Sequence, residues 1–134
     1  MYNTFKWFGI IAFAAVIVFS MAGCDLENND YGKLNGVWDR GDIVVTFNDS
    51  NAVFTQINSN SGWVTVQNNG NVKIGDKKFK NLKSSGDLKW TGQELGYDTS
   101  TYVTMWKDCT ITIDSSGQTI YTSSSLGNDS YTKK

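Results

Sequence analysis

The chain has 134 residues, with 12 lysine and arginine side chains against 13 aspartate and glutamate side chains, a formal net charge of −1. A balance this close leaves no dominant basic surface, so nucleic-acid binding is not expected. Histidine is absent, which excludes Ser-His-Asp and Cys-His nucleophilic sites, and the chain shows no zinc-ligand spacing or phosphate-cradling glycine loop. We therefore expect a non-enzymatic protein with no catalytic residues, metal or cofactor.

Residues 1–23 have the layout of a secretory signal peptide, which is expected to be helical. Lys6 precedes an apolar run from Trp7 to Ala22, and the run is shorter than the roughly 20 residues that span a bilayer. The lysine and the free amino group favour a cytoplasmic N-terminus. Everything after Cys24 is therefore expected to be exported.

The stretch Ser20-Met21-Ala22-Gly23-Cys24 resembles the lipobox of bacterial lipoproteins, with Met21 where that family usually has leucine. The resemblance implies that Cys24 carries a diacylglycerol and becomes the mature N-terminus, in the cell envelope and facing the periplasm or the cell surface. Two or more buried acyl chains are enough for stable membrane attachment. Two alternatives stay open: an ordinary cleavage site that releases a free secreted protein, and an uncleaved membrane anchor.

The mature part has the size of one domain and is expected to be a monomer. Residues 24–33 are acidic and rich in asparagine and have no apolar periodicity, so they are expected to form a lipidated tether. From Leu34 onward, apolar residues recur with a period of two, and residues 34–134 are expected to form the folded domain.

Alternation and turn residues predict eight to ten short strands and no helix in the mature part. The pattern indicates an all-β fold, a small antiparallel up-and-down β-barrel, with a β-sandwich as the alternative. Six lysines between Lys73 and Lys89 are interpreted as a solvated strand edge, or else as a docking patch for an anionic partner. The expected strands are 43–47, 52–57, 63–66, 72–74, 88–95, 102–106, 109–114, 118–124 and 130–133.

Leu34-Asn35-Gly36-Val37-Trp38 opens the folded domain and resembles the Gly-x-Trp start of lipocalins and related barrels. The resemblance implies that Gly36 permits a close turn into the first strand and that Trp38 closes one end of the barrel. Lipocalins pack a C-terminal arginine on this tryptophan. The only arginine here is Arg40, so Lys133 is the candidate for that packing role.

Arg40-Gly41-Asp42 resembles the integrin-recognition tripeptide and would lie in a turn between two strands. The same residues are good turn formers in their own right, because glycine tolerates positive φ. We favour the turn interpretation and keep recognition as the alternative.

The remaining candidates are aromatic residues and Cys109. Alternation places Cys109 on the same face as Ile111 and Ile113, which favours a small buried hydrophobe over a nucleophile. An apolar ligand or a sugar ring could stack against aromatic side chains that line a cavity. The candidates for that role are Trp63, Trp90, Tyr102 and Trp106.

Two functions follow from this interpretation. In the first, an exported, lipid-anchored barrel holds a small hydrophobic ligand among its inward-facing residues. In the second, the lipoprotein binds a protein partner, a host component or an inhibited hydrolase, through its loops and outer face. Barrels of about eight short strands are often filled by their own side chains, so a closed interior would favour the second function.

Overall fold

A computed structural model describes residues 30–134 of the chain. The expected signal peptide, the candidate lipidation residue Cys24 and the first part of the tether lie outside the described residues. Within residues 30–134 the chain forms eight β-strands and one short helix, α2 (Trp63–Asn68). The strands are β1 (Gly36–Asp39), β2 (Ile43–Asn48), β3 (Asn51–Ile57), β4 (Lys77–Gly86), β5 (Lys89–Tyr97), β6 (Thr104–Ile113), β7 (Thr119–Ser124) and β8 (Gly127–Lys133).

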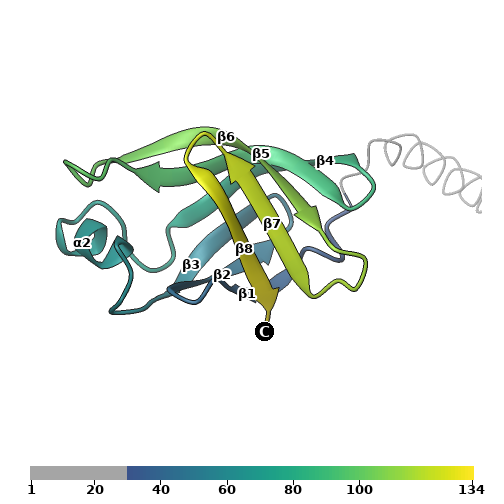
Figure 1. Ribbon diagram of the computed structural model, residues 1–134, viewed down its shortest axis with the longest axis horizontal. Coiled ribbons are helices and arrows are strands. Elements are labelled where there is room, and N and C mark those ends of the chain that lie inside the picture. The colour runs from purple at the N-terminus through teal and green to yellow at the C-terminus, as the bar shows by residue number, and fades with distance from the viewer. Residues whose placement is uncertain (1–29) are drawn as a thin grey trace, which may run out of the picture.

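Each strand pairs antiparallel with the next one in sequence, and β8 pairs with β1, so the sheet closes on itself (Figure 1). The closing pairs join Trp38 to Lys133 and Asp39 to Thr132. Closure pairs the two strands that would otherwise be sheet edges. The predicted all-β, up-and-down antiparallel barrel is therefore confirmed, and the alternative β-sandwich is not formed.

Large apolar side chains fill the barrel interior. Trp38, Val45 and Phe54 occupy neighbouring register positions on β1, β2 and β3, and all three are fully buried. Phe79 of β4 stacks against Phe47 of β2 with 5.3 Å between ring centroids. The period of two seen in the sequence thus places the bulky residues of successive strands on one inward face.

All members of this core lie between Leu34 and Tyr131. A protein that begins at Asp25 keeps every one of these side chains and every strand pair of the closed barrel. It is therefore expected to fold without residues 1–24.

Residues 63–74 do not form the two strands expected at 63–66 and 72–74. Trp63–Asn68 is helix α2, and Val72–Ile74 forms no strand. Trp63 and Val66 lie three residues apart on one helix face, and both are buried. A helix of six residues is too short for its period to be distinguished from strand alternation. Trp63 packs against Phe54, with 4.9 Å between ring centroids, so α2 covers one end of the barrel.

The predicted break between strands 102–106 and 109–114 is wrong, because β6 runs from Thr104 to Ile113 without interruption. Lys107 and Asp108 lie at the expected break, and both pair with residues of β5. In the sequence alone these two polar residues look like a connection, but pairing with the long strand β5 keeps them within β6. The short gaps between the expected strands 43–47 and 52–57, and between 109–114 and 118–124, do contain the turns that join β2 to β3 and β6 to β7.

Two residues assigned to the tether, Asp30 and Tyr31, are hydrogen-bonded to the barrel. The Tyr31 hydroxyl donates a hydrogen bond to the Leu82 carbonyl oxygen at 2.6 Å. The Trp90 indole N–H donates to the Asp30 carbonyl oxygen at 3.1 Å. These two bonds fix the start of the described chain near the β4–β5 turn.

A β-bulge in β4 turns one lysine inward. Ala52 pairs with Phe79 and the next residue, Val53, pairs with Lys77, so Lys78 is an extra residue between two register pairs. A bulge residue can share a face with its neighbour, and Lys78 and Phe79 are both buried. The lysine-rich segment was expected to be a solvated edge. That expectation is wrong for Lys78, which is 2% exposed.

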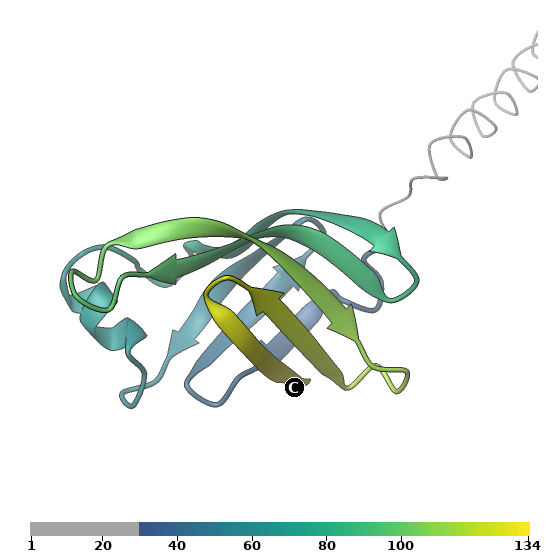
Figure 2. The same ribbon diagram turned by 45° about the horizontal axis from the view of Figure 1, so that its top comes forward.

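The connections β1–β2, β3–β4, β5–β6 and β7–β8 lie at the barrel end that α2 covers, because consecutive strands run in opposite directions (Figure 2). Residue 30 lies at the opposite end (Figure 1). Among residues 30–134, no helix has the length and apolar character needed to cross a membrane.

Candidate functional site

A hollow of about 220 Å³ opens at the α2 end of the barrel. Gly96, in its wall, makes room for the side chain of Leu126 from the β7–β8 turn, because a Cβ atom at this position would clash with it. Four of the ten lining residues are charged, so the hollow is polar. The lining residues are Arg40, Trp63, Lys78, Glu94, Leu95, Gly96, Tyr97, Thr99, Leu126 and Asp129.

A buried ion pair forms the inner wall of this hollow. The Lys78 ammonium donates to Glu94 Oε2 at 2.8 Å and to the Leu95 carbonyl oxygen at 2.7 Å. Both side chains are almost fully buried, 2% exposed for Lys78 and 4% for Glu94. Burial lowers the pKa of Lys78, while the Glu94 carboxylate opposes that shift. The ammonium also lies 5.3 Å from the centroid of the Trp63 ring.

A second charged cluster borders the same hollow. Arg40 Nε donates to Asp42 Oδ1 at 2.6 Å and Nη2 donates to Oδ2 at 2.8 Å, a bidentate pair. Arg40 Nη1 donates to Asp129 Oδ2 at 3.3 Å, and the Ser61 hydroxyl donates to Asp42 Oδ2. The hydrogen bond from Arg40 lowers the pKa of the Asp42 carboxyl.

The pairing of Arg40 with Asp42 makes the Arg40-Gly41-Asp42 tripeptide a poor recognition motif. The arginine and aspartate charges that integrin recognition would use are bound to each other, and the Arg40 side chain is only 17% exposed. Gly41 has φ of +108°, a conformation that glycine adopts without strain. The tripeptide therefore acts as a turn that seals one side of the hollow.

Tyr131 carries an unpaired hydroxyl close to these charges. Its side chain is 1% exposed, and Oη has no hydrogen-bond partner within residues 30–134. The Arg40 guanidinium lies 6.0 Å from the centroid of the tyrosine ring. Burial raises the pKa of Tyr131, and Glu94 and Asp129 raise it further, so the phenol is neutral.

The four aromatic residues proposed as a ligand site do not converge. Trp63 and Tyr102 both contact Tyr97, at centroid distances of 4.7 Å and 5.9 Å, at the α2 end. Trp90 lies at the opposite end, where it is hydrogen-bonded to Asp30. Trp106 faces the Lys80 ammonium, 4.1 Å from its ring centroid. Only Trp63 lines the hollow.

Trp38 and Gly36 lie toward the end of the barrel opposite α2. The Trp38 indole N–H donates to the Leu34 carbonyl oxygen at 2.7 Å, and the side chain is fully buried. The Lys133 ammonium lies 5.1 Å from the centroid of the Trp38 ring, in the packing position suggested for it. Gly36 has φ of +129° at the start of β1, so its backbone takes a conformation that favours glycine.

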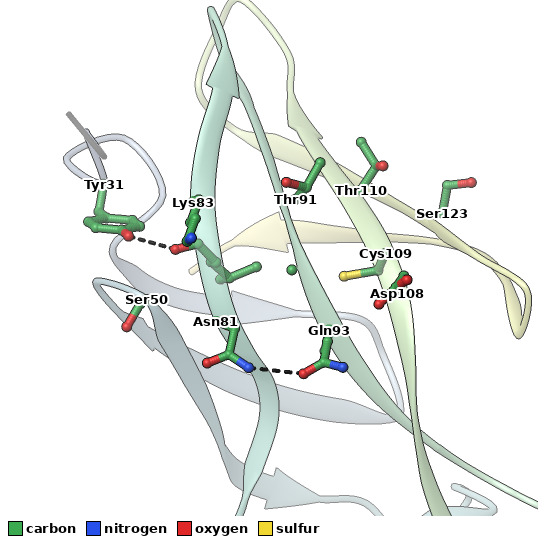
Figure 3. A pocket seen from close by; sticks show the side chains of 12 residues that line it. Tyr31, Ser50, Asn81, Lys83, Thr91, Gln93, Asp108, Cys109, Thr110 and Ser123 are labelled. Atoms are coloured by element: carbon green, nitrogen blue, oxygen red, sulfur yellow. Dashed lines mark hydrogen bonds between the residues drawn. The ribbon is translucent and has the colours of Figure 1, made fainter. Parts of the chain in front are cut away.

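An open groove of about 870 Å³ crosses β4, β5, β6 and β7 (Figure 3). Thr91, Thr110 and Ser123 form one row across three strands, and Asn81 is hydrogen-bonded to Gln93. No buried side-chain polar atom in this groove lacks a hydrogen-bond partner within the described residues. Among residues 30–134, the groove therefore has no buried, unpaired polar group that a ligand could satisfy.

The thiol of Cys109 lies at the floor of this groove and is 5% exposed. Burial, together with the Glu94 charge, raises its pKa to about 12. A thiol in this environment stays protonated at neutral pH and is a poor nucleophile. Its inward position next to Ile111 agrees with the interpretation as a small buried hydrophobe.

Comparison with protein-family models, with curated proteins and with solved structures finds no match for this chain. The chemistry of the α2-end hollow is therefore inferred from the side chains that line it. Two positive side chains that line it, Arg40 and Lys78, are paired with two negative ones, Asp129 and Glu94. Asp42 pairs with Arg40 but does not line the hollow. Within residues 30–134, no three cysteine, aspartate or glutamate side chains lie close enough to hold a metal ion.

The sequence reasoning missed Lys78, Glu94, Asp129 and Tyr131 as a group. A signal for Glu94 was present, because Trp90, Gly92, Glu94 and Gly96 share one parity on β5, and Trp90 is an inward residue. The same parity places a carboxylate inside a barrel, where it needs a partner. No sequence signal identified Lys78 as that partner, because the bulge that turns it inward breaks the alternation.

Proposed function

We propose that this protein is an exported, lipid-anchored binding module without catalytic activity, and that the α2 end of its barrel is the recognition face. Cys24 carries the lipid, and the mature protein is a monomer. The barrel is lipocalin-like in its Gly36-x-Trp38 opening and in the packing of Lys133 on Trp38. The observation that carries the proposal is that four charged side chains line a hollow at the α2 end, with the unpaired Tyr131 hydroxyl close to them.

Because side chains fill the barrel interior, the α2 end is a better candidate for a binding site than a ligand cup along the barrel axis. Trp38, Phe47, Phe54 and Phe79 are at most 2% exposed and pack against one another inside the sheet. The α2-end hollow, at about 220 Å³, is smaller than the roughly 300 Å³ at which drug-sized sites begin. It fits a small group better than a lipid or a large apolar molecule.

The position of the tether supports the same face. Cys24 precedes Asp30 by six residues, which span at most about 20 Å when extended. Asp30 lies at the end opposite α2. A lipid at Cys24 would hold that end near the membrane and direct the α2 end away from it.

A protein partner is the second candidate, and exposed apolar side chains favour it. Ile74, Val103 and Leu126 are 46%, 56% and 39% exposed and belong to connections at the α2 end. Exposed apolar side chains that gather at one end of a protein are a common mark of a protein-binding surface. On this candidate, the hollow receives one side chain of the partner.

A dye titration separates the end site from an axial ligand cup. Because large side chains fill the interior, we expect no saturable binding of 1-anilinonaphthalene-8-sulfonate by the folded protein that begins at Asp25, measured by dye fluorescence. The same protein in acid, where packing loosens, serves as the positive control. Saturable binding to the native protein, at one dye per chain, would contradict the proposal and restore the hydrophobic-ligand carrier.

The lipid anchor is tested on the full chain expressed in a bacterium. Radiolabelled palmitate should be incorporated into the wild-type protein, which should partition with membranes. Cys24→Ala should lose the label and appear in the soluble exported fraction or as unprocessed precursor. Cys109→Ala, which removes the other cysteine, should keep both the label and the membrane partition. Equal labelling of Cys24→Ala and wild type would refute lipidation at this residue.

A further inference from the structure

We propose that the α2-end hollow binds a small aldehyde covalently, as an imine on the side-chain nitrogen of Lys78. This inference rests on the proposed recognition face and names the chemistry of its ligand. Two observations carry it: a desolvated lysine lies in the wall of the hollow, and a carboxylate lies at hydrogen-bond distance from the lysine nitrogen.

The Lys78 nitrogen lies among residues that line the hollow. It donates to Glu94 Oε2 at 2.8 Å and to the Leu95 carbonyl oxygen at 2.7 Å, and it lies 5.3 Å from the centroid of the Trp63 ring. Lys78 and these three neighbours all line the hollow. An ammonium has three N–H donors, and the third donor of Lys78 has no hydrogen-bond partner within residues 30–134. A ligand in the hollow therefore meets a nitrogen that the fold leaves partly unpaired.

Burial makes this nitrogen a better nucleophile than that of a surface lysine. The Lys78 side chain is 2% exposed, and desolvation lowers its pKa, although the Glu94 carboxylate opposes that shift. The neutral amine, not the ammonium, attacks a carbonyl carbon, and desolvated lysines in pockets are the ones that form Schiff bases. Lys83, on the same strand, is exposed and provides the reference.

Glu94 supplies the proton transfers that imine formation needs. It accepts one proton from the Lys78 ammonium, which frees the nitrogen lone pair. The nitrogen then bonds to the aldehyde carbon, the C=O π bond breaks, and a second proton moves from nitrogen to oxygen to give a carbinolamine. The carbinolamine hydroxyl takes the proton held by Glu94 and leaves as water while the C=N bond forms. The product is a protonated imine paired with the Glu94 carboxylate, and no oxidant or reductant is needed.

The size and the border of the hollow limit the ligand. The volume of about 220 Å³ admits a compact molecule, and an aldehyde carbon carries one hydrogen, which leaves room for the attacking nitrogen. Leu126 lines the hollow and is 39% exposed, so it borders the opening. A larger side chain at this position would narrow the entrance and keep both members of the Lys78–Glu94 pair.

The test is reductive trapping of the protein that begins at Asp25 with propanal and sodium cyanoborohydride at neutral pH. The hydride converts an imine into a stable propylamine, and peptide mass spectrometry gives the labelling rate of each lysine. We expect Lys78 to be labelled at least about tenfold faster than Lys83, because a positioned proton-transfer group accelerates such steps by about a hundredfold or more and burial slows entry. In urea, where the protein is unfolded, the difference should disappear.

Two variants test whether the aldehyde reaches Lys78 through the hollow. Leu126→Trp should lower the labelling rate of Lys78 by about fivefold, because it obstructs the approach to the nitrogen, and should leave that of Lys83 unchanged. Tyr121→Trp, at an exposed residue of β7 outside the hollow, is the matched control and should change neither rate. Labelling of Lys78 that is no faster than that of Lys83 in the folded protein, or that Leu126→Trp leaves unaltered, would overturn the aldehyde assignment.

Propanol has the size of propanal but no carbonyl, so it separates this failure from failure of the recognition face. If Lys78 is not labelled preferentially and propanol still shifts the amide ¹H–¹⁵N signals of Gly96 and Leu126 saturably, the aldehyde assignment is wrong and the α2 end remains a binding face. If neither preferential labelling nor these shifts occur, the α2 end itself is contradicted as well.

Discussion

Replacing Lys78 by methionine is expected to lower the free energy of unfolding by about 3–5 kcal/mol, because it leaves Glu94 as an uncompensated buried charge. The lysine is 2% exposed and donates to both Glu94 and the Leu95 carbonyl oxygen, so two acceptors lose their donor at once. Urea unfolding followed by tryptophan fluorescence measures the loss as a shift in midpoint at constant slope.

Two further variants separate charge from packing. Lys83→Met changes an exposed lysine of the same strand and should alter the free energy of unfolding by no more than about 0.5 kcal/mol. Lys78→Met combined with Glu94→Leu removes both charges and should recover most of the loss, because apolar replacements of a buried pair are often neutral. A single Lys78→Met variant as stable as wild type would mean that the pair is solvated, which contradicts the structure.

Lys78 also shows where sequence reasoning reaches its limit on the fold. Most strands and their connections were predicted, because alternation of apolar residues reports directly on the inward face of a barrel strand. The bulge at Lys78 shifts that alternation by one residue, and only pairing with β3 and β5 determines which way the side chain points. Helix α2 was missed because its six residues, Trp63–Asn68, are too few for the sequence pattern to distinguish a helical period from strand alternation.

The candidate site was harder to predict than the fold, because its residues are far apart in the sequence. Arg40 and Asp42 were singled out as parts of a tripeptide, but Asp129, the second partner of Arg40, is almost ninety residues away. Its contact with Arg40 depends on closure of β8 against β1. Tyr131 lies in the expected last strand, 130–133, and its unpaired hydroxyl becomes visible only in the packed interior. Trp63, by contrast, was named from its type alone and does line the hollow.

Trp38→Ala is expected to lower the free energy of unfolding by about 3–5 kcal/mol, as for other large aromatic residues removed from a packed core. Trp38 is fully buried, packs beside Val45 and Lys133, and donates its indole N–H to Leu34. Urea unfolding gives the change. Trp38→Phe is the matched control: it keeps most of the packing and removes the N–H donor, so it should cost less than Trp38→Ala.

Trp38→Ala also tests whether the side chains that fill the barrel interior prevent it from binding an apolar ligand. Removing the indole leaves an apolar cavity, and engineered apolar cavities in well-packed proteins bind small apolar molecules. Folded Trp38→Ala should therefore bind benzene saturably, detected as a rise in melting temperature that increases with benzene concentration, whereas wild type should show no such rise. Benzene binding by wild type would mean that the barrel already contains an accessible apolar cavity. In that case the ligand carrier, rather than recognition at the α2 end, would be the function that the barrel supports.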